Sequence, residues 1–149
     1  MAAQQTLALI KPDAIKASNV GNIIKKIEEN NFKILQLFML QLSKQEAEEF
    51  YSAHKDKPFF DDLTNFISSG EVIVMILDKA NAIEEWRNLM GATNPKEAEK
   101  GTIRAEFAKS IDENSVHGSD SVEAAIEEIS FFFDIDDETE EELDSVTAS

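Results

Sequence analysis

Apolar and polar residues alternate in blocks along the chain, and each block has the period of one kind of secondary structure. The short apolar run Thr6–Ile10 predicts a buried strand, ended by a proline turn at Lys11-Pro12-Asp13. Between Val20 and Asn30 the apolar residues recur at helical spacing, which predicts an amphipathic helix. The segment Phe32–Leu42 is rich in Ile, Leu, Phe and Met, and it predicts a long central strand.

The middle of the chain continues this alternation. Ser43, with Glu46 three residues later, has the capping-box pattern of a helix start, so we expect a helix from Ser43 to about His54. Three further elements follow, namely a helix over Phe59–Ser68, a buried strand over Val72–Leu77 and a helix over Ala82–Met90.

The C-terminal part begins with a weakly patterned stretch. Gly91–Asn114 spans about 24 residues, and a loop of that length in a compact domain is usually functional. A short strand then leads to His117. The final predicted helix runs from Ser121 to about Phe131 and is expected to bury four apolar side chains, those of Val122, Ala125, Ile126 and Ile129.

Strands that alternate with helices predict an α/β (α+β) architecture. Four strands with two βαβ-like crossovers fit a ferredoxin-like split βαβ fold, a four-stranded antiparallel sheet covered by helices on one face. The expected organisation is one domain over residues 1–133, followed by an acidic, disordered tail over residues 134–149.

Charge limits the partners that the surface favours. The formal net charge is −16, and residues 134–149 hold eight acids and no base, which is half of it. Such a field repels nucleic acid but leaves room for a small anion in a local cationic pocket. We see no signal peptide and no apolar run that could span a membrane. The absence of cysteine is compatible with a cytoplasmic location.

Candidate chemistry gathers at residues 114–121, around one of only two histidines. Asp120 with Glu123 forms a second capping-box pattern, so His117 is expected at a strand end just before a helix N-terminus, where an anion is favourable. The sequence contains no Gly-rich phosphate loop, no protein-kinase motif set and no metal-ligand cluster. His117 is therefore a candidate nucleophile for phosphate chemistry. The alternative is that it is an ordinary polar residue in a Gly-Ser turn.

Three basic residues differ from the lysines on the polar faces of the predicted helices by their position in the sequence. Lys11 directly follows a buried strand, Arg87 adjoins the apolar Trp86, and Arg104 lies in the long loop. Arginine suits bidentate phosphate contacts, but surface salt bridges explain the two arginines equally well.

In its motifs and their order, the chain closely resembles nucleoside diphosphate kinases of the bacterial type over roughly residues 5–133. The resemblance rests on segments in matching order and spacing: Lys11-Pro12-Asp13, Phe50-Tyr51, Lys57-Pro58-Phe59-Phe60, Ser69-Gly70, residues 90–95, residues 101–104 and residues 114–121. It implies a ping-pong transfer in which His117 takes the γ-phosphate of a nucleoside triphosphate and passes it to a nucleoside diphosphate, maintaining nucleotide pools.

The resemblance also implies a role for each matching residue. Lys11 and Asn114 would contact the sugar hydroxyls, with Lys11 and Tyr51 near the reacting phosphate. Phe59 would stack on the base in a slot lined by Leu63 and Ile111, whereas Arg87, Thr93 and Arg104 would hold the phosphates. Glu128 and Ser119 would orient the imidazole. Mg²⁺ would bind the nucleotide phosphates without a direct protein ligand, with a water-mediated link to Asp120. The expected assembly is a homo-oligomer, a tetramer or hexamer.

Some features depart from the family pattern, and rival functions stay open. Glu71 stands where the family usually has proline, and the acidic tail matches no family feature. A non-catalytic nucleotide-binding member and a phosphocarrier that phosphorylates a protein partner are the alternatives, with nucleic-acid binding disfavoured by charge. His54 is expected to be a surface residue without a role.

Overall fold

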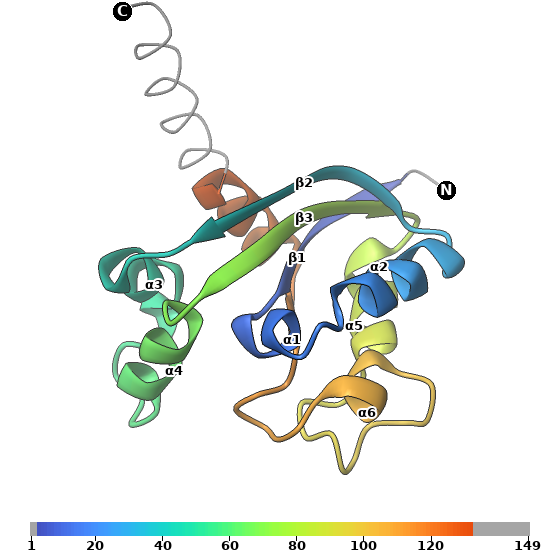
Figure 1. Cartoon of the computed structure of the whole chain (residues 1–149). Coiled ribbons are helices and arrows are strands. Elements are labelled where there is room, and N and C mark those ends of the chain that lie inside the picture. The colour runs from blue at the N-terminus through green and yellow to red at the C-terminus, as the bar shows by residue number, and fades with distance from the viewer. Residues whose placement is uncertain (1–2, 133–149) are drawn as a thin grey trace, which may run out of the picture.

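The computed structural model describes residues 3–132, which form an α+β fold around one four-stranded antiparallel sheet (Figure 1). The strands are β1 (Gln4–Ile10), β2 (Lys33–Gln41), β3 (Glu71–Lys79) and β4 (Val116–Gly118), in the sheet order β2-β3-β1-β4. This order and the antiparallel pairing confirm the predicted ferredoxin-like sheet.

The central position of β1 and β3 in the sheet explains why both strands are apolar. β1 pairs with β3 along the whole of β1, with Leu7 opposite Ile76 and Leu9 opposite Val74, and residues 6–10 and 72–77 are buried on both faces of the sheet. The prediction that Phe32–Leu42 is a central strand was wrong, because β2 lies at the sheet edge. There its side chains Leu37 and Met39 are 47% and 49% exposed.

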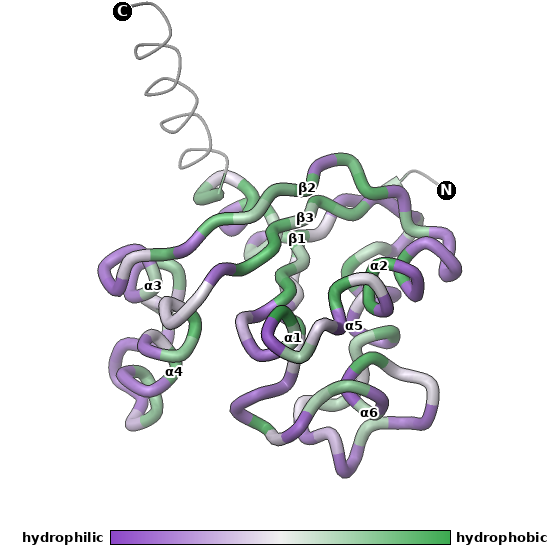
Figure 2. Tube along the Cα trace, viewed as in Figure 1, coloured by the Kyte–Doolittle hydropathy of each residue, from purple (hydrophilic) through white to green (hydrophobic). Residues whose placement is uncertain are grey.

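Helices pack against both faces of the sheet, so the prediction of cover on one face was also wrong. Successive strand residues point to opposite faces. Ala8 and Ile10 belong to the core under α2 (Val20–Glu29) and α5 (Ala82–Met90), whereas Leu7 and Leu9 belong to the core under α3 (Lys44–Phe50) and α4 (Phe60–Ile67). Figure 1 shows these two groups of helices standing apart from one another, and Figure 2 shows mostly hydrophobic residues along the central strands between them.

The predicted helices appear close to their expected bounds. They are α2 (Val20–Glu29), α3 (Lys44–Phe50), α4 (Phe60–Ile67) and α5 (Ala82–Met90), with a single 3₁₀ turn, η1, over Ser52–His54. The predicted capping box is present, since the Ser43 hydroxyl accepts from the Glu46 N–H and the Glu46 carboxylate accepts from the Ser43 N–H.

Two short helices replace predicted irregular structure. Pro12 does not make a turn but starts the helix α1 (Pro12–Lys16), where its missing N–H is not needed. The stretch after Gly91 contains α6 (Ile103–Phe107), whose first turn is capped by the Thr102 hydroxyl. The long loop predicted over residues 91–114 is therefore divided into two shorter segments on either side of α6.

The last described helix covers residues 122–132, and two predictions about it need correction. Ser121, not Asp120, provides the cap, because its hydroxyl accepts from the Ala124 N–H and Asp120 lies one residue too early. Val122 and Ile126 are 53% and 62% exposed, contrary to the prediction, whereas Ala125 is buried as predicted and Phe132 is buried with it. The predicted acidic tail, residues 134–149, lies outside the described residues. Within residues 3–132, no helix is long and apolar enough to cross a membrane.

Candidate functional site

The candidate nucleophile sits in the shortest strand. β4 pairs with β1 so that His117 lies opposite Leu9, which places its half-buried imidazole at the edge of the sheet. The ring Nε2 lies 3.0 Å from Glu128 Oε1, and the Ser119 hydroxyl donates to the same carboxylate oxygen at 2.9 Å. Because a carboxylate only accepts, Nε2 must carry the hydrogen, which leaves the lone pair of a neutral imidazole on Nδ1.

Two aromatic rings hold the imidazole from the side of α3. Phe50 packs edge-on against it with centroids 5.3 Å apart, and Tyr51 does so at 6.1 Å. Burial raises the pKa of the Tyr51 hydroxyl further above its usual value, so Tyr51 remains a protonated donor. Sequence reasoning assigned no role to Phe50, although the Phe50-Tyr51 pair was part of the resemblance.

Lys11 and Asn114 meet although they are far apart in sequence. Lys11 Nζ donates to Asn114 Oδ1 at 2.8 Å, and both residues are buried. Burial, followed by the nearby Arg104 guanidinium, lowers the pKa of Lys11 to about 8. An anionic ligand beside this ammonium would therefore stabilise its charged form.

The backbone between Asn114 and His117 makes a tight, strained turn. Ser115 has φ +74° and the Val116 N–H donates to the Asn114 carbonyl at 2.9 Å, the pattern of a γ-turn, which is rare for a residue with a side chain. Asp13 Oδ2 accepts from the Ser115 N–H at 3.0 Å, and the Lys11 N–H donates to the Ser115 carbonyl at 2.8 Å. Lys11 and Asp13, at the start of α1, thus hold the strained turn from two sides.

Arg104 has a second task besides the expected phosphate contact. Its guanidinium donates to three main-chain carbonyls, those of Gly91 (3.0 Å), Asn114 (3.3 Å) and Val116 (2.9 Å). Two of its five N–H groups remain for a ligand. Burial, and then the charge of Arg87, lowers the pKa of Arg104 to about 10, so it stays cationic at neutral pH.

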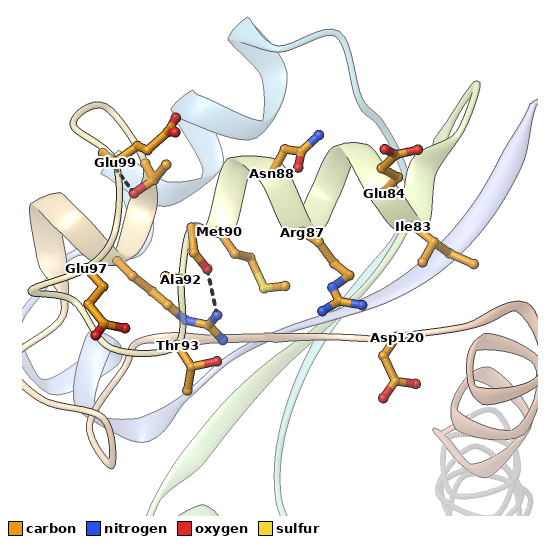
Figure 3. A pocket seen from close by; sticks show the side chains of 13 residues that line it. Ile83, Glu84, Arg87, Asn88, Met90, Ala92, Thr93, Glu97, Glu99 and Asp120 are labelled. Atoms are coloured by element: carbon orange, nitrogen blue, oxygen red, sulfur yellow. Dashed lines mark hydrogen bonds between the residues drawn. The ribbon is translucent and has the colours of Figure 1, made fainter.

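Two cavities meet at Asp120. One, of about 720 Å³, is lined by Arg87, Thr93 and Arg104, together with acidic residues of α5 and of the following loop. Figure 3 shows Arg87 on α5 and Asp120 on the segment after β4, two of the residues that line it. The other cavity, of about 320 Å³, is lined by Tyr51, His117 and Glu128. The phosphate-binding candidates and the nucleophile therefore open on adjoining spaces.

The expected base-stacking residues stand apart from these cavities. Phe59 and Ile111 are 49% and 54% exposed, and Leu63 follows Phe59 by one turn of α4, half-buried on the core. His54, expected to be without a role, lies beside Phe59 with ring centroids 5.9 Å apart and lines the smaller cavity. Among residues 3–132, no group of three or more acidic or histidine side chains could hold a metal ion by itself.

Comparison with known proteins identifies a consistent set of relatives. The profile of the family described as nucleoside diphosphate kinase matches residues 4–138. A nucleoside diphosphate kinase of Helicobacter hepaticus is 58% identical over 130 residues, 87% of this chain and 95% of the relative. Nucleoside diphosphate kinase 1 of Protochlamydia amoebophila is 53% identical over 139 residues, 93% of this chain and 99% of the relative.

Solved structures agree with the sequence relatives. The nucleoside diphosphate kinase of Aquifex aeolicus superposes with a TM-score of 0.86 at 37% identity, covering 88% of this chain and 95% of that chain. The halophilic enzyme of Halobacterium salinarum, solved in complex with CDP, superposes with a TM-score of 0.84 at 37% identity and covers 88% of both chains.

Proposed function

Because the chain belongs to the nucleoside diphosphate kinase family, whose members transfer phosphate from nucleoside triphosphates to nucleoside diphosphates, we propose that this transfer runs through a phosphohistidine at His117. The reaction is ping-pong. The imidazole attacks the γ-phosphorus, the bond to the β-phosphate bridging oxygen breaks, and the diphosphate leaves. A second nucleoside diphosphate then attacks the phosphohistidine and restores the histidine, so the enzyme maintains the pools of NTPs and dNTPs.

The observation that supports this proposal is the hydrogen bond from His117 Nε2 to Glu128. With the hydrogen on Nε2, Nδ1 would be the attacking atom, and Glu128 would hold the ring in one orientation, as a buried acid does for the base of a catalytic triad. The carboxylate also balances the positive charge that the ring acquires as phosphate is transferred to it. Ser119 Oγ holds the carboxylate and supports the same geometry.

Three positively charged side chains would bind the phosphates. Arg104 and Arg87 open on the larger cavity with Thr93, and Lys11 lies buried against Asn114. In this proposal, Lys11 and Asn114 contact the sugar hydroxyls, Lys11 also approaches the transferred phosphate, and Tyr51 donates to it. Because phosphoryl transfer needs positioned charge more than covalent chemistry, these residues would supply most of the acceleration.

The exposed Phe59 supports recognition of any base. We propose that the base stacks on its ring between Leu63 and Ile111. Every base has a π-face, so stacking accepts purines and pyrimidines alike. Contacts to the sugar leave the base edges unread, which is consistent with use of several nucleotides.

Mg²⁺ would enter with the nucleotide. The larger cavity has several carboxylates beside its arginines, among them the exposed Asp120, but they do not form a closed ligand set. That composition fits an ion that keeps most of its waters and binds the phosphates, with Asp120 accepting from one of those waters. When bound, the ion neutralises charge on the phosphate oxygens.

The deciding experiment follows the phosphate on the protein. We expect γ-labelled ATP with Mg²⁺ to give an acid-labile, base-stable phosphoprotein, and a chase with GDP or CDP to release the label as a new triphosphate. His117→Ala should abolish labelling, whereas His54→Ala, the chain's other histidine, should keep it. Absence of label in the unsubstituted protein, or label that survives His117→Ala, contradicts the proposal. Label that leaves only to a protein acceptor indicates a phosphocarrier.

A homo-oligomer, tetramer or hexamer, is the proposed assembly. The edge strand β2 supports it, because its exposed Leu37 and Met39 form an apolar strip where a strand could add. Leu37→Lys with Met39→Lys should lower the molar mass measured by light scattering, whereas Val122→Lys, at an equally exposed apolar residue, should leave it unchanged. An unaltered mass in the double variant would remove β2 from the interface. The cytoplasmic location stays a prediction.

A further inference from the structure

Trp86 is the only tryptophan of the chain and is completely buried. It lies on the inner face of α5 and packs edge-on against Phe32, with ring centroids 6.1 Å apart. A buried indole needs an acceptor for its single N–H. The acceptor is the main-chain carbonyl of His117, at 3.2 Å.

Gly118 allows this contact. A Cβ atom at Gly118 would lie 2.4 Å from Trp86 Cδ1 and 2.5 Å from Trp86 Nε1, distances that no real side chain adopts. The φ of Gly118 is not in the left-handed region, so the position requires space and not backbone freedom. The indole therefore lies directly against the strand that carries the nucleophile.

The same helix also carries a phosphate-binding candidate. Arg87 follows Trp86 in α5 and opens on the larger cavity. The hydrogen bond from Trp86 to the His117 carbonyl therefore connects α5, which carries Arg87, to the backbone of β4, which carries His117. β4 is short and pairs with β1 on one side, and its carbonyls are held by the Arg104 guanidinium at Val116 and by α5, through Trp86, at His117.

We propose that Trp86 is a positioning residue for phosphoryl transfer: its indole N–H, bonded to the His117 carbonyl, keeps the imidazole at a fixed separation from Arg87. This inference rests on the proposed phosphohistidine at His117. Small misplacements of a reacting group reduce rates strongly, whereas they change ground-state binding little. The expected signature is a slower transfer step with unchanged nucleotide affinity.

The first test compares Trp86→Phe, which keeps an aromatic ring but loses the donor, with Phe32→Leu, which loosens the same packing and keeps the donor. Rapid-quench measurements at saturating ATP give the rate and the final stoichiometry of labelling. We expect Trp86→Phe to slow labelling about three- to tenfold with affinity for ATP within about twofold, as loss of one hydrogen bond predicts. Phe32→Leu should lower the melting temperature and keep the rate within about twofold.

A second test changes one atom and avoids a folding defect. Because the chain has a single tryptophan, growth of a tryptophan auxotroph on an analogue replaces only this residue. Benzothienylalanine puts sulfur in place of the indole N–H, whereas azatryptophan keeps the N–H and serves as the matched control. The sulfur analogue should slow labelling about threefold or more relative to azatryptophan.

Equal labelling rates for the two analogues, or an equal slowing in Trp86→Phe and Phe32→Leu, would overturn the positioning role while leaving the phosphohistidine intact. A loss of nucleotide affinity with an unchanged transfer rate would also overturn it. Failure of the unsubstituted protein to take up label would overturn the proposed function and this inference together.

Discussion

Replacing Lys11 with methionine should leave the fold at least as stable at neutral pH while it destroys activity. Lys11 is 6% exposed and carries its charge among buried groups, where burial and Arg104 lower its pKa from 10.5 to about 8. In the unfolded chain Lys11 is solvated and keeps its ordinary pKa, so burial of the charged form lowers the stability of the native state. Methionine keeps a similar unbranched side chain without the charge.

The size of the effect follows from the pKa. A shift from 10.5 to about 8 corresponds to about 3 kcal/mol at pH values below both. Loss of the hydrogen bond to Asn114 Oδ1 leaves a buried acceptor and offsets this by about 1–3 kcal/mol. At pH 7 we therefore expect Lys11→Met to be as stable as the unsubstituted protein or more stable by up to about 2 kcal/mol.

The pH dependence of stability distinguishes removal of the buried charge from a change in packing. As pH rises above about 8, the native Lys11 loses its proton while the unfolded chain still holds one, so the unsubstituted protein gains stability. The advantage of Lys11→Met should accordingly shrink by about 2 kcal/mol between about pH 7 and about pH 9.5.

Urea unfolding followed by Trp86 fluorescence measures the difference at each pH. Asn114→Ala is the paired variant, because it breaks the same hydrogen bond but leaves the ammonium buried, and it should lose about 1–3 kcal/mol. A difference between Lys11→Met and the unsubstituted protein that stays constant with pH, or a Lys11→Met variant as unstable as Asn114→Ala, would refute the reasoning.

Three further substitutions test other contacts of the site. Glu128→Gln removes the charge beside the imidazole and should slow labelling of His117 about 10- to 100-fold in rapid-quench assays, whereas the exposed Glu123→Gln should have no effect. Arg104→Lys gives up hydrogen bonds to main-chain carbonyls and should lower the free energy of unfolding in urea by about 2–4 kcal/mol, and a loss as small as that of the exposed Arg87→Lys would contradict this. Gly118→Ala should lower the melting temperature through its clash with Trp86, whereas Gly21→Ala, in an open helical position, should raise stability by about 0.5–1 kcal/mol; equal effects would remove the clash as a cause.

Sequence patterns predicted which segments are helices and strands better than where each one lies. The periods of β1, α2, β3 and α5 were read correctly because each has a clear buried stripe or run. Period alone could not distinguish β2 from a central strand, since its exposed residues are also apolar. Likewise, Val122 and Ile126 have the spacing of a core stripe with Ala125, yet they are exposed, whereas Ala125 and Phe132 face inward. Only packing against the sheet decides which stripe is buried.

The site was predictable to the extent that its chemistry lies in side chains. The resemblance brought Lys11 together with Asn114 and His117 with Glu128, and both pairs are in hydrogen-bond contact. Contacts to the main chain leave no such signal. Neither the three carbonyls bound by Arg104 nor the left-handed Ser115 follows from residue type, because any residue offers a carbonyl and serine has no preference for that conformation.

Two residues expected to bind the nucleotide, Lys11 and Arg104, also stabilise the backbone turn that precedes His117. Lys11 reaches the Asn114 side chain through Nζ and the Ser115 carbonyl through its N–H, and Arg104 donates to carbonyls on both sides of the strained turn. A loss of activity on substitution of either residue therefore does not by itself identify a phosphate contact. Lys11→Met separates the two roles, because the backbone N–H that holds Ser115 remains while the ammonium is removed. If labelling of His117 fails in a variant that is as stable as the unsubstituted protein, the charge of Lys11 acts on the nucleotide and not on the fold.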